Sequence, residues 1–196
     1  MSKSKLAKQI RTWRMASGMS QKFLAASLGV SQQAISYWEK GVDRPSPKVM
    51  SALRDLMMTD RSFMAEKVSV ENAKLVSALV DIEGTKLVST SRGFAQLWPS
   101  LLQYRDTPLE NHLVGELAIL AHDRQFRREI MAREIIAVTG ISDRHLDFEN
   151  DHAIRHRWHL RFRSIGFFHL GEMIFEPCDP SLATGIDGVV RLQDVV

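Results

Sequence analysis

Two adjacent glutamines, Gln32 and Gln33, and a serine one turn later, Ser36, are the residues whose types and spacing first suggest a chemistry. A glutamine amide both donates and accepts hydrogen bonds, so it can bridge the N6 and N7 edge of adenine in the major groove of DNA. The Ser36 hydroxyl can reach a base edge or a phosphate. Such groups in the first turns of one helix predict a surface that reads base pairs.

The segment 20–41 is patterned to carry these side chains on the second of two short helices. Ser20 is a good N-cap for the first helix, and apolar residues follow it at helical spacing: Phe23, Leu24 and Leu28. Gly29 supplies the positive φ of a sharp helix exit, and Ser31 caps the second helix. The positions of the second helix expected to face inward are Ala34, Ile35 and Trp38. This is a helix-turn-helix arrangement, and an α-helix has the width of the major groove.

Over roughly residues 5 to 57 the chain resembles the lambda-repressor/Cro-like helix-turn-helix proteins, the XRE family. The features that carry the resemblance are Arg14, Ser20-Gln21, Leu24-Ala25, Leu28-Gly29-Val30-Ser31, Ile35-Ser36, Trp38-Glu39-Lys40-Gly41 and Pro45. The resemblance implies that Gln21 contacts a phosphate. It also implies that Arg14 and Glu39 form an internal ion pair between the first helix and the end of the recognition helix, and so are structural.

Basic residues after the recognition helix, Lys40, Arg44 and Lys48, are expected to touch the sugar-phosphate backbone, which positions a protein without specifying sequence. The alternative is that they form a solvated basic surface. Tyr37 can lie over a phosphate or simply cover the domain. The full set of expected DNA contacts is Gln21, Ser31, Gln32, Gln33, Ser36, Tyr37, Lys40, Arg44 and Lys48. Trp13 and Trp38 are expected in the core, because both lie at helical spacing with other apolar residues.

Charge is divided unevenly along the chain. Residues 1–58 carry ten Lys/Arg against three Asp/Glu, a net of +7, and the remaining residues carry sixteen against twenty, a net of −4. A basic N-terminal part is typical of phosphate binding. The sequence has neither a long apolar run nor a secretory signal, so we expect no membrane span. Its one cysteine, Cys178, excludes an internal disulfide and suits a reducing cytoplasm.

The 196 residues are expected to form two domains. The first, 1–58, is an all-α helix-turn-helix domain of about five helices, whose last helix starts at Ser46-Pro47. Residues 59–72 lack Pro and Gly, which favours a helical connector; it either transmits strain or pairs in a dimer, or it is a packed spacer. The second domain, 73–196, is expected to be α+β with an antiparallel sheet. Its expected strands lie at 75–82, 86–90, 154–163, 167–175 and 188–195, with a short helix at 91–97 and a largely helical stretch at 109–138.

Two strands, several helices and three strands is the order found in PAS-like sensor domains. The segment ALVDIEGTKLVSTSRGFAQLW resembles their opening hairpin and helix. The segment GEMIFEPCDPSLATGIDGVVRLQDV resembles their closing strands, including an acidic residue, Asp194. This weaker resemblance covers about residues 73 to 196 and implies a sheet flanked by helices, a small-molecule pocket or none, and frequent dimerisation. A generic α+β ligand domain would show the same order.

No cofactor and no metal are expected. His152, His156 and His159 have metal-ligand spacing for a helix, but on a strand His156 and His159 would point to opposite faces, and no cysteine or paired carboxylate completes a site. His112 or His122 can be proposed as a haem ligand, yet neither lies in a specific motif. No phosphate-binding glycine loop occurs.

The strand expected at 154–163 alternates apolar and basic residues. One face carries His159 and four arginines, Arg155, Arg157, Arg161 and Arg163. These arginines can bind an anionic ligand or a second stretch of DNA. The favoured alternative is that they pair across the sheet with acidic neighbours such as Glu172 and Glu176, or face water at an edge.

The sequence therefore favours a cytoplasmic, sequence-specific transcriptional regulator that is not an enzyme. It is expected to bind a pseudo-palindromic operator as a homodimer, because one such domain reads only a few base pairs. A repressor is favoured over an activator, and the second domain can hold a small effector.

Two other classes of protein remain as alternatives. One is an antitoxin- or phage-type repressor whose second domain binds another protein. The other is an enzyme fused to a DNA-binding domain, with Asp123, Glu129 and Glu134 as its available carboxylates. Those three lie among arginines on an apparent solvated helix face, and no nucleophile, base and orienter stand at a recognisable spacing.

Overall fold

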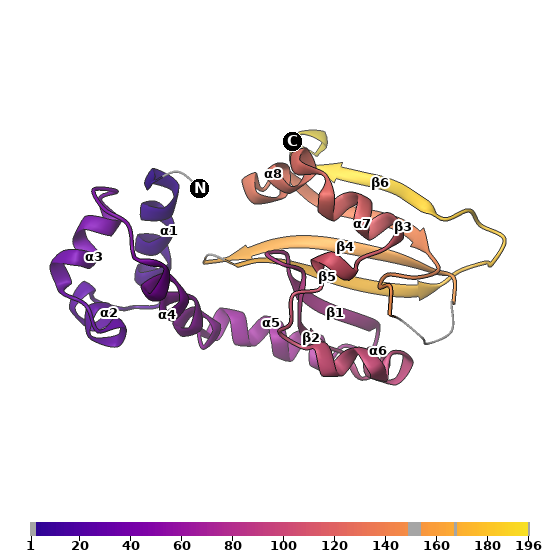
Figure 1. Ribbon diagram of the computed structural model, residues 1–196, viewed down its shortest axis with the longest axis horizontal. Coiled ribbons are helices and arrows are strands. Elements are labelled where there is room, and N and C mark those ends of the chain that lie inside the picture. The colour runs from indigo at the N-terminus through magenta and orange to yellow at the C-terminus, as the bar shows by residue number, and fades with distance from the viewer. Residues whose placement is uncertain (1–2, 149–153, 167, 196) are drawn as a thin grey trace. The chain divides into compact units, whose positions relative to one another are not determined.

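The computed structural model describes residues 3–148, 154–166 and 168–195. The chain divides into two compact units, and the division falls within helix α5, between Ala65 and Glu66. The described N-terminal unit is helical, and the C-terminal unit is an antiparallel sheet with helices (Figure 1). The predicted fold class is confirmed. Among the described residues, no helix is both long and apolar enough to cross a membrane.

In its described residues the N-terminal unit contains four whole helices, before the first part of α5. They are α1 (Lys3–Ala16), α2 (Gln21–Leu28), α3 (Gln32–Glu39) and α4 (Pro47–Met58). Each helix contributes one side chain that is 0% exposed: Ile10, Leu24, Ile35 and Leu53. Trp13 and Trp38 are buried in this unit as well, as their spacing predicted.

Helix α5 (Arg61–Glu71) follows, in the segment that the sequence indicated as a helical connector. Its second half packs against the sheet of the C-terminal unit. The Glu66 carboxylate accepts a hydrogen bond from Arg163, and the Ser89 hydroxyl donates to the Glu71 carboxylate at 3.0 Å. These contacts fix the end of α5 on one face of the sheet.

The sheet has six strands in the order β2-β1-β5-β4-β3-β6. The strands are β1 (Val76–Asp81), β2 (Lys86–Thr90), β3 (Ile135–Ser142), β4 (His156–Ile165), β5 (Phe168–Pro177) and β6 (Gly185–Arg191). Strand β1 pairs antiparallel with both β2 and β5, and β3 pairs antiparallel with both β4 and β6. Chain-distant segments thus lie side by side, so that Ala78 is opposite Met173.

The sequence prediction was wrong at β3. It continued a helix to Val138, whereas the strand already begins at Ile135. Helix α8 (Arg124–Ala132) is followed by Arg133, which adopts a left-handed conformation with φ 65°, and β3 begins two residues after Arg133. The sequence of β3, IIAVTGIS, is rich in β-branched residues, which favour a strand once the helix has been stopped. The helical prediction therefore ran too far because nothing in the side chain of Arg133 indicates a helix stop.

The helices of the C-terminal unit lie between β2 and β3 in the chain, except for a final short turn. They are α6 (Arg92–Leu97), η1 (Pro99–Tyr104), η2 (Glu110–His112), α7 (Gly115–His122), α8 (Arg124–Ala132) and η3 (Leu192–Asp194). Helices α7 and α8 pack on β3, and α6 packs on β1. The core between sheet and helices includes Leu120, Phe126, Val138, Trp158 and Leu160.

One close contact between neighbouring strands of the sheet requires a glycine. Gly140 of β3 is paired with Trp158 of β4. A Cβ atom at Gly140 would lie 2.4 Å from the Trp158 indole and 2.7 Å from the carbonyl oxygen of Gly185. The indole N–H donates to the Ser142 hydroxyl at 2.9 Å, which holds the ring in this position.

Candidate nucleic-acid interface

Side-chain caps and a glycine fix the turn between α2 and α3. The Ser20 hydroxyl accepts a hydrogen bond from the Phe23 N–H at 3.1 Å, and the Ser31 hydroxyl accepts one from the Ala34 N–H at the same distance. Gly29 ends α2 with φ 65°, as the sequence predicted. Each cap satisfies a backbone donor that the first turn of a helix otherwise leaves unpaired.

A charge pair joins α1 to the end of α3. The Arg14 guanidinium donates to both carboxylate oxygens of Glu39, at 2.6 and 3.0 Å, and to the carbonyl oxygen of Met19 at 2.7 Å. The Arg14 and Glu39 side chains are only 12% and 4% exposed. This is the ion pair that the family resemblance implied.

The surroundings of Glu39 keep it ionised. Burial alone would raise the pKa of its carboxyl, but hydrogen bonds from Arg14 and Gln21 outweigh burial and lower that pKa below its ordinary value. The hydrogen bond to Glu39 raises the pKa of Arg14 in turn. The pair therefore stays charged through the physiological range and anchors α3 against α1.

Gln21 belongs to the same network. Its amide nitrogen donates to Glu39 at 2.9 Å, and the side chain is half-buried at the start of α2. An amide nitrogen carries two N–H groups, so this bond orients the side chain and leaves a second N–H for a phosphate. The expected phosphate contact of Gln21 stays a prediction, to which the structure adds a fixed orientation.

The expected base-reading residues lie on the surface of α3. Gln32 and Gln33 are exposed, Ser36 is half-buried, and Ile35 and Trp38 point into the core. The Gln33 amide nitrogen donates to the Tyr37 hydroxyl at 2.8 Å. The structure thus couples two expected contact residues, and Ser31 lies exposed at the N-terminus of the same helix.

Basic side chains surround this surface. Lys40, Arg44 and Lys48 are exposed, as a role in binding the DNA backbone requires. A depression beside the end of α3 is lined by Lys40 together with Lys8 and Arg11 of α1. Lys8 and Arg11 were not among the predicted contacts, although their spacing of three residues on a helix places them on one face.

Comparisons with known proteins agree with this geometry. Residues 10–57 match the family model described as helix-turn-helix, so this segment is similar to that family and the predicted helix-turn-helix is confirmed. A comparison of the whole chain with curated proteins finds no match.

Among solved structures, the chain is similar to PAS and light-oxygen-voltage domains. One is a PAS domain from a two-component sensor histidine kinase, with 11% identity, a TM-score of 0.39, and coverage of 59% of this chain and 95% of that chain. Another is a PAS domain of an HTR-like protein from Haloarcula marismortui, with 13% identity, a TM-score of 0.38, and coverage of 63% and 98%. A third is RsLOV, with 14% identity, a TM-score of 0.44, and coverage of 63% and 72%.

The structure separates the histidines that the sequence grouped. His156 is buried on the core face of β4, and its partner on that face is His145, with 2.5 Å between their Nε2 atoms. His159 is on the opposite face, 3.6 Å from a Glu176 carboxylate oxygen. His152 lies outside the described residues. In the described part of the chain, no three His, Cys, Asp or Glu side chains come together as a metal site.

His145 was not predicted as a site residue. Its pKa is lowered to about 3, chiefly by burial and additionally by the neighbouring His156. The haem candidates have simpler surroundings: His112 is exposed and 3.1 Å from Asp147, and His122 is exposed with its ring against the Ala118 carbonyl.

The basic face of β4 is paired with acidic residues, as the favoured interpretation held. Arg161 and Arg163 both donate to Glu172, at 2.8 and 2.6 Å, and Arg163 also binds Glu66. Arg157 lies 3.7 Å from Asp187, and Arg155 binds Asp143 at 2.6 Å. This face therefore carries little uncompensated positive charge for DNA.

The three carboxylates considered for an enzyme have structural surroundings. Asp123 caps α8 by accepting hydrogen bonds from two backbone N–H groups, at 2.7 and 3.1 Å. Glu129 accepts hydrogen bonds from Gln125 and Arg191, and Glu134 is exposed. These contacts account for the positions of Asp123 and Glu129.

Proposed function

We propose that the protein is a sequence-specific transcriptional regulator that binds a pseudo-palindromic DNA operator as a homodimer, and that it acts as a repressor rather than an activator. The observation that carries the proposal is the polar surface of α3, held by the Arg14–Glu39 pair beneath it. The helix-turn-helix match at residues 10–57 supports it. Its place of action would be the compartment that holds the chromosome, the cytoplasm.

The homodimer is proposed from the physics of recognition. A single helix in the major groove contacts few base pairs, and two half-sites one helical turn apart, about 34 Å, multiply the specificity. We assign dimerisation and the binding of a small effector to the C-terminal unit, with no catalytic reaction. Two apolar cavities between its sheet and helices support the effector role.

Selection of bound fragments from genomic DNA tests the proposal. We expect recovery of a two-fold symmetric sequence with half-sites about 10 base pairs apart. Gln32→Ala should weaken binding to that sequence by about 5- to 150-fold, because a bidentate amide–adenine contact contributes about 1–3 kcal/mol. Ser51→Ala, at an exposed position of α4, is the control and should bind normally.

Uniform recovery of all fragments would refute the proposal that the protein is a sequence-specific regulator. If the Gln32→Ala variant bound the symmetric site equally well, residues other than Gln32 would make the base contacts. Sedimentation at the concentration used for binding measures the dimer directly, and a monomer on DNA with a single half-site would contradict the homodimer.

A further inference from the structure

Two adjoining apolar cavities lie between the sheet and the helices of the C-terminal unit. The first encloses about 80 Å³ and the second about 70 Å³. Both are lined by Val80, Thr85, Leu113, Leu117 and Met173, so the two cavities adjoin. An apolar cavity of about 150 Å³ in another protein stays dry and takes up benzene. Movement of the shared side chains would join the two cavities into a space of similar volume, with room for a small apolar molecule.

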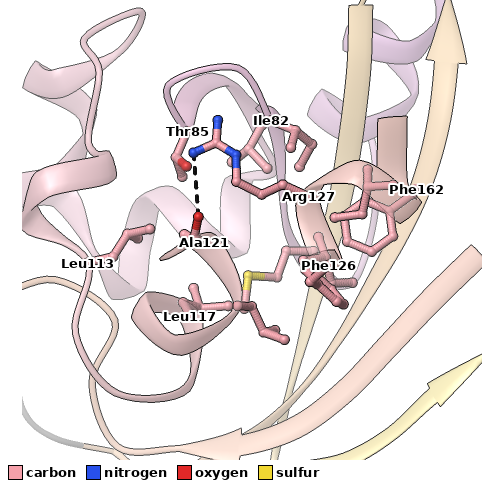
Figure 2. A pocket seen from close by; sticks show the side chains of 13 residues that line it. Ile82, Thr85, Leu113, Leu117, Ala121, Phe126, Arg127 and Phe162 are labelled. Atoms are coloured by element: carbon pink, nitrogen blue, oxygen red, sulfur yellow. Dashed lines mark hydrogen bonds between the residues drawn. The ribbon is translucent and has the colours of Figure 1, made fainter. Parts of the chain in front are cut away.

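One charged group faces this apolar space. Among the 13 described residues that line the first cavity, Thr85 and Arg127 alone have polar side chains. Figure 2 shows the Arg127 guanidinium reaching toward Thr85 and the carbonyl oxygen of Ala121, while Leu117 and Phe126 lie on the other side of the pocket. No acidic side chain is among the lining residues.

The contacts of Arg127 leave room for a second anion. Its Nη1 atom donates to the Glu110 carboxylate and, at 3.4 Å, to the Ala121 carbonyl oxygen. Both contacts use the same nitrogen, whereas a guanidinium carries five N–H groups in a planar fork. The Arg127 and Glu110 side chains are 36% and 29% exposed, so the fork stands where the cavity meets solvent. A carboxylate entering there can bind the fork while its apolar part fills the cavity.

Thr85 marks the same place from the opposite wall. It adopts φ 50° in the turn between β1 and β2, a left-handed conformation that is uncommon for a β-branched residue. Its side chain lines both cavities, and in Figure 2 the Arg127 guanidinium points toward it. The Thr85 hydroxyl offers a ligand oxygen a second donor on the wall of the same cavity.

We propose that this cavity binds a small apolar monocarboxylate, with its carboxylate on Arg127 and its hydrocarbon tail among Leu113, Leu117, Phe126 and Met173. An amine would place a second cation against Arg127, and a neutral molecule would fill the cavity without using the guanidinium. The inference rests on the proposed effector role for its biological meaning. The binding step itself needs no DNA and can be measured alone.

The test is a titration of the purified full chain at pH 7.5 with hexanoate and with hexan-1-ol, which has the same number of carbons and no charge. Trp98 lines the second cavity and its fluorescence reports occupancy. We expect saturable binding of hexanoate at one site, at least tenfold tighter than that of the alcohol. Butanoate should bind more weakly than hexanoate by about fourfold per methylene removed.

Three variants sharpen the test. Arg127→Gln should abolish the preference for the acid, and Arg128→Gln, its exposed neighbour on α8, should keep it. Leu117→Trp should fill the cavity and weaken acid and alcohol alike. If Arg127→Gln fails to fold, the comparison of acid and alcohol on the unmodified chain still tests whether the cavity prefers a carboxylate.

Equal affinities for acid and alcohol, or an unsaturable signal, would overturn the inference, as would a preference that survives Arg127→Gln. Separate measurement of operator binding distinguishes this failure from that of the proposed function. A chain that binds its operator but no monocarboxylate refutes the ligand alone. A chain that binds hexanoate but no specific DNA sequence refutes the regulator alone.

Discussion

At the scale of single residues, the proposed base-reading surface of α3 depends on one buried charge pair. Glu39 is almost inaccessible, and its charge is compensated by Arg14 with help from Gln21. Removing one partner of such a pair leaves an unpaired buried charge, which costs far more than the pair contributes. Helix α3 is therefore sensitive to a change at Arg14, which lies on another helix, α1.

We predict that Arg14→Ala lowers the free energy of unfolding of the N-terminal unit by about 3 kcal/mol. The physical reason is the carboxylate of Glu39, which would remain buried without its bidentate partner. Urea unfolding followed by circular dichroism measures the change. Lys40→Ala, an exposed neighbour, is the control; an equal loss in both variants would show that the pair has no special role.

A second residue-scale prediction concerns His145. The pKa of its imidazole is about 3 in the folded chain, mainly because of burial, against about 6.5 when unfolded. The unfolded state thus takes up the proton first. The contribution of the neutral ring to stability is complete above about pH 6.5 and declines from there toward about pH 3, by about 1.4 kcal/mol per pH unit.

Urea unfolding of the C-terminal unit between pH 7.5 and 5.0 tests this dependence. The unmodified chain should lose stability across that range, and His145→Gln should show a flatter profile from a lower starting value. The exposed His112→Gln variant should follow the unmodified chain. Parallel profiles for all three would contradict the assignment to His145.

The sequence predicted some of these residues and not others, for a physical reason. The Arg14–Glu39 pair was expected because a family resemblance supplied a contact between residues 25 apart. The His145–His156 pair was not, because strand alternation placed His156 inward but gave no partner from the loop after β3. Contacts made by a loop follow from the three-dimensional path of the chain, which local periodicity does not contain.

At the scale of elements, the same limit explains β3. The helices around Ser20, Ser31 and Ser46 were predicted with their caps, since Ser side chains and Gly29 mark the ends chemically. The end of α8 carries no such mark, because an arginine occupies the left-handed position where glycine is usual. Because no glycine marks the end of α8, the predicted helix extended into the residues that form β3.

The left-handed Arg133 yields an element-scale prediction. Arg133→Gly should raise the free energy of unfolding by up to about 1 kcal/mol, since glycine adopts φ 65° without the cost borne by a side chain. Arg128→Gly, in the interior of the same helix, should lower it by about 1 kcal/mol. Thermal unfolding of the two variants gives the comparison, and changes of the same sign would contradict the prediction.

At the scale of the whole molecule, the two units have opposite charge, +7 for residues 1–58 and −4 for the rest. The arginines of β4 are paired internally, so DNA affinity should come from the N-terminal unit. We predict a steep loss of affinity with salt, with a slope of about −0.9 in log K against log salt for each phosphate contacted.

Fluorescence anisotropy with a DNA duplex measures this slope. The salt concentration is varied from about 50 to 200 mM, a range in which such losses of affinity are large. Lys40→Ala should make the slope shallower by about one unit. Lys74→Ala, an exposed lysine of the C-terminal unit, should leave it unchanged. An equal effect of both variants would show that the phosphate-binding surface extends beyond the N-terminal unit.

The close contact between Gly140 and Trp158 has a consequence for the evolution of this fold. The two positions cannot change independently, because any side chain at residue 140 would occupy the volume of the indole. A larger residue at 140 needs a smaller residue at 158 and also a shift of the backbone that carries the Gly185 carbonyl. Descendants of a common ancestor should therefore keep glycine at 140 as long as tryptophan stands at 158.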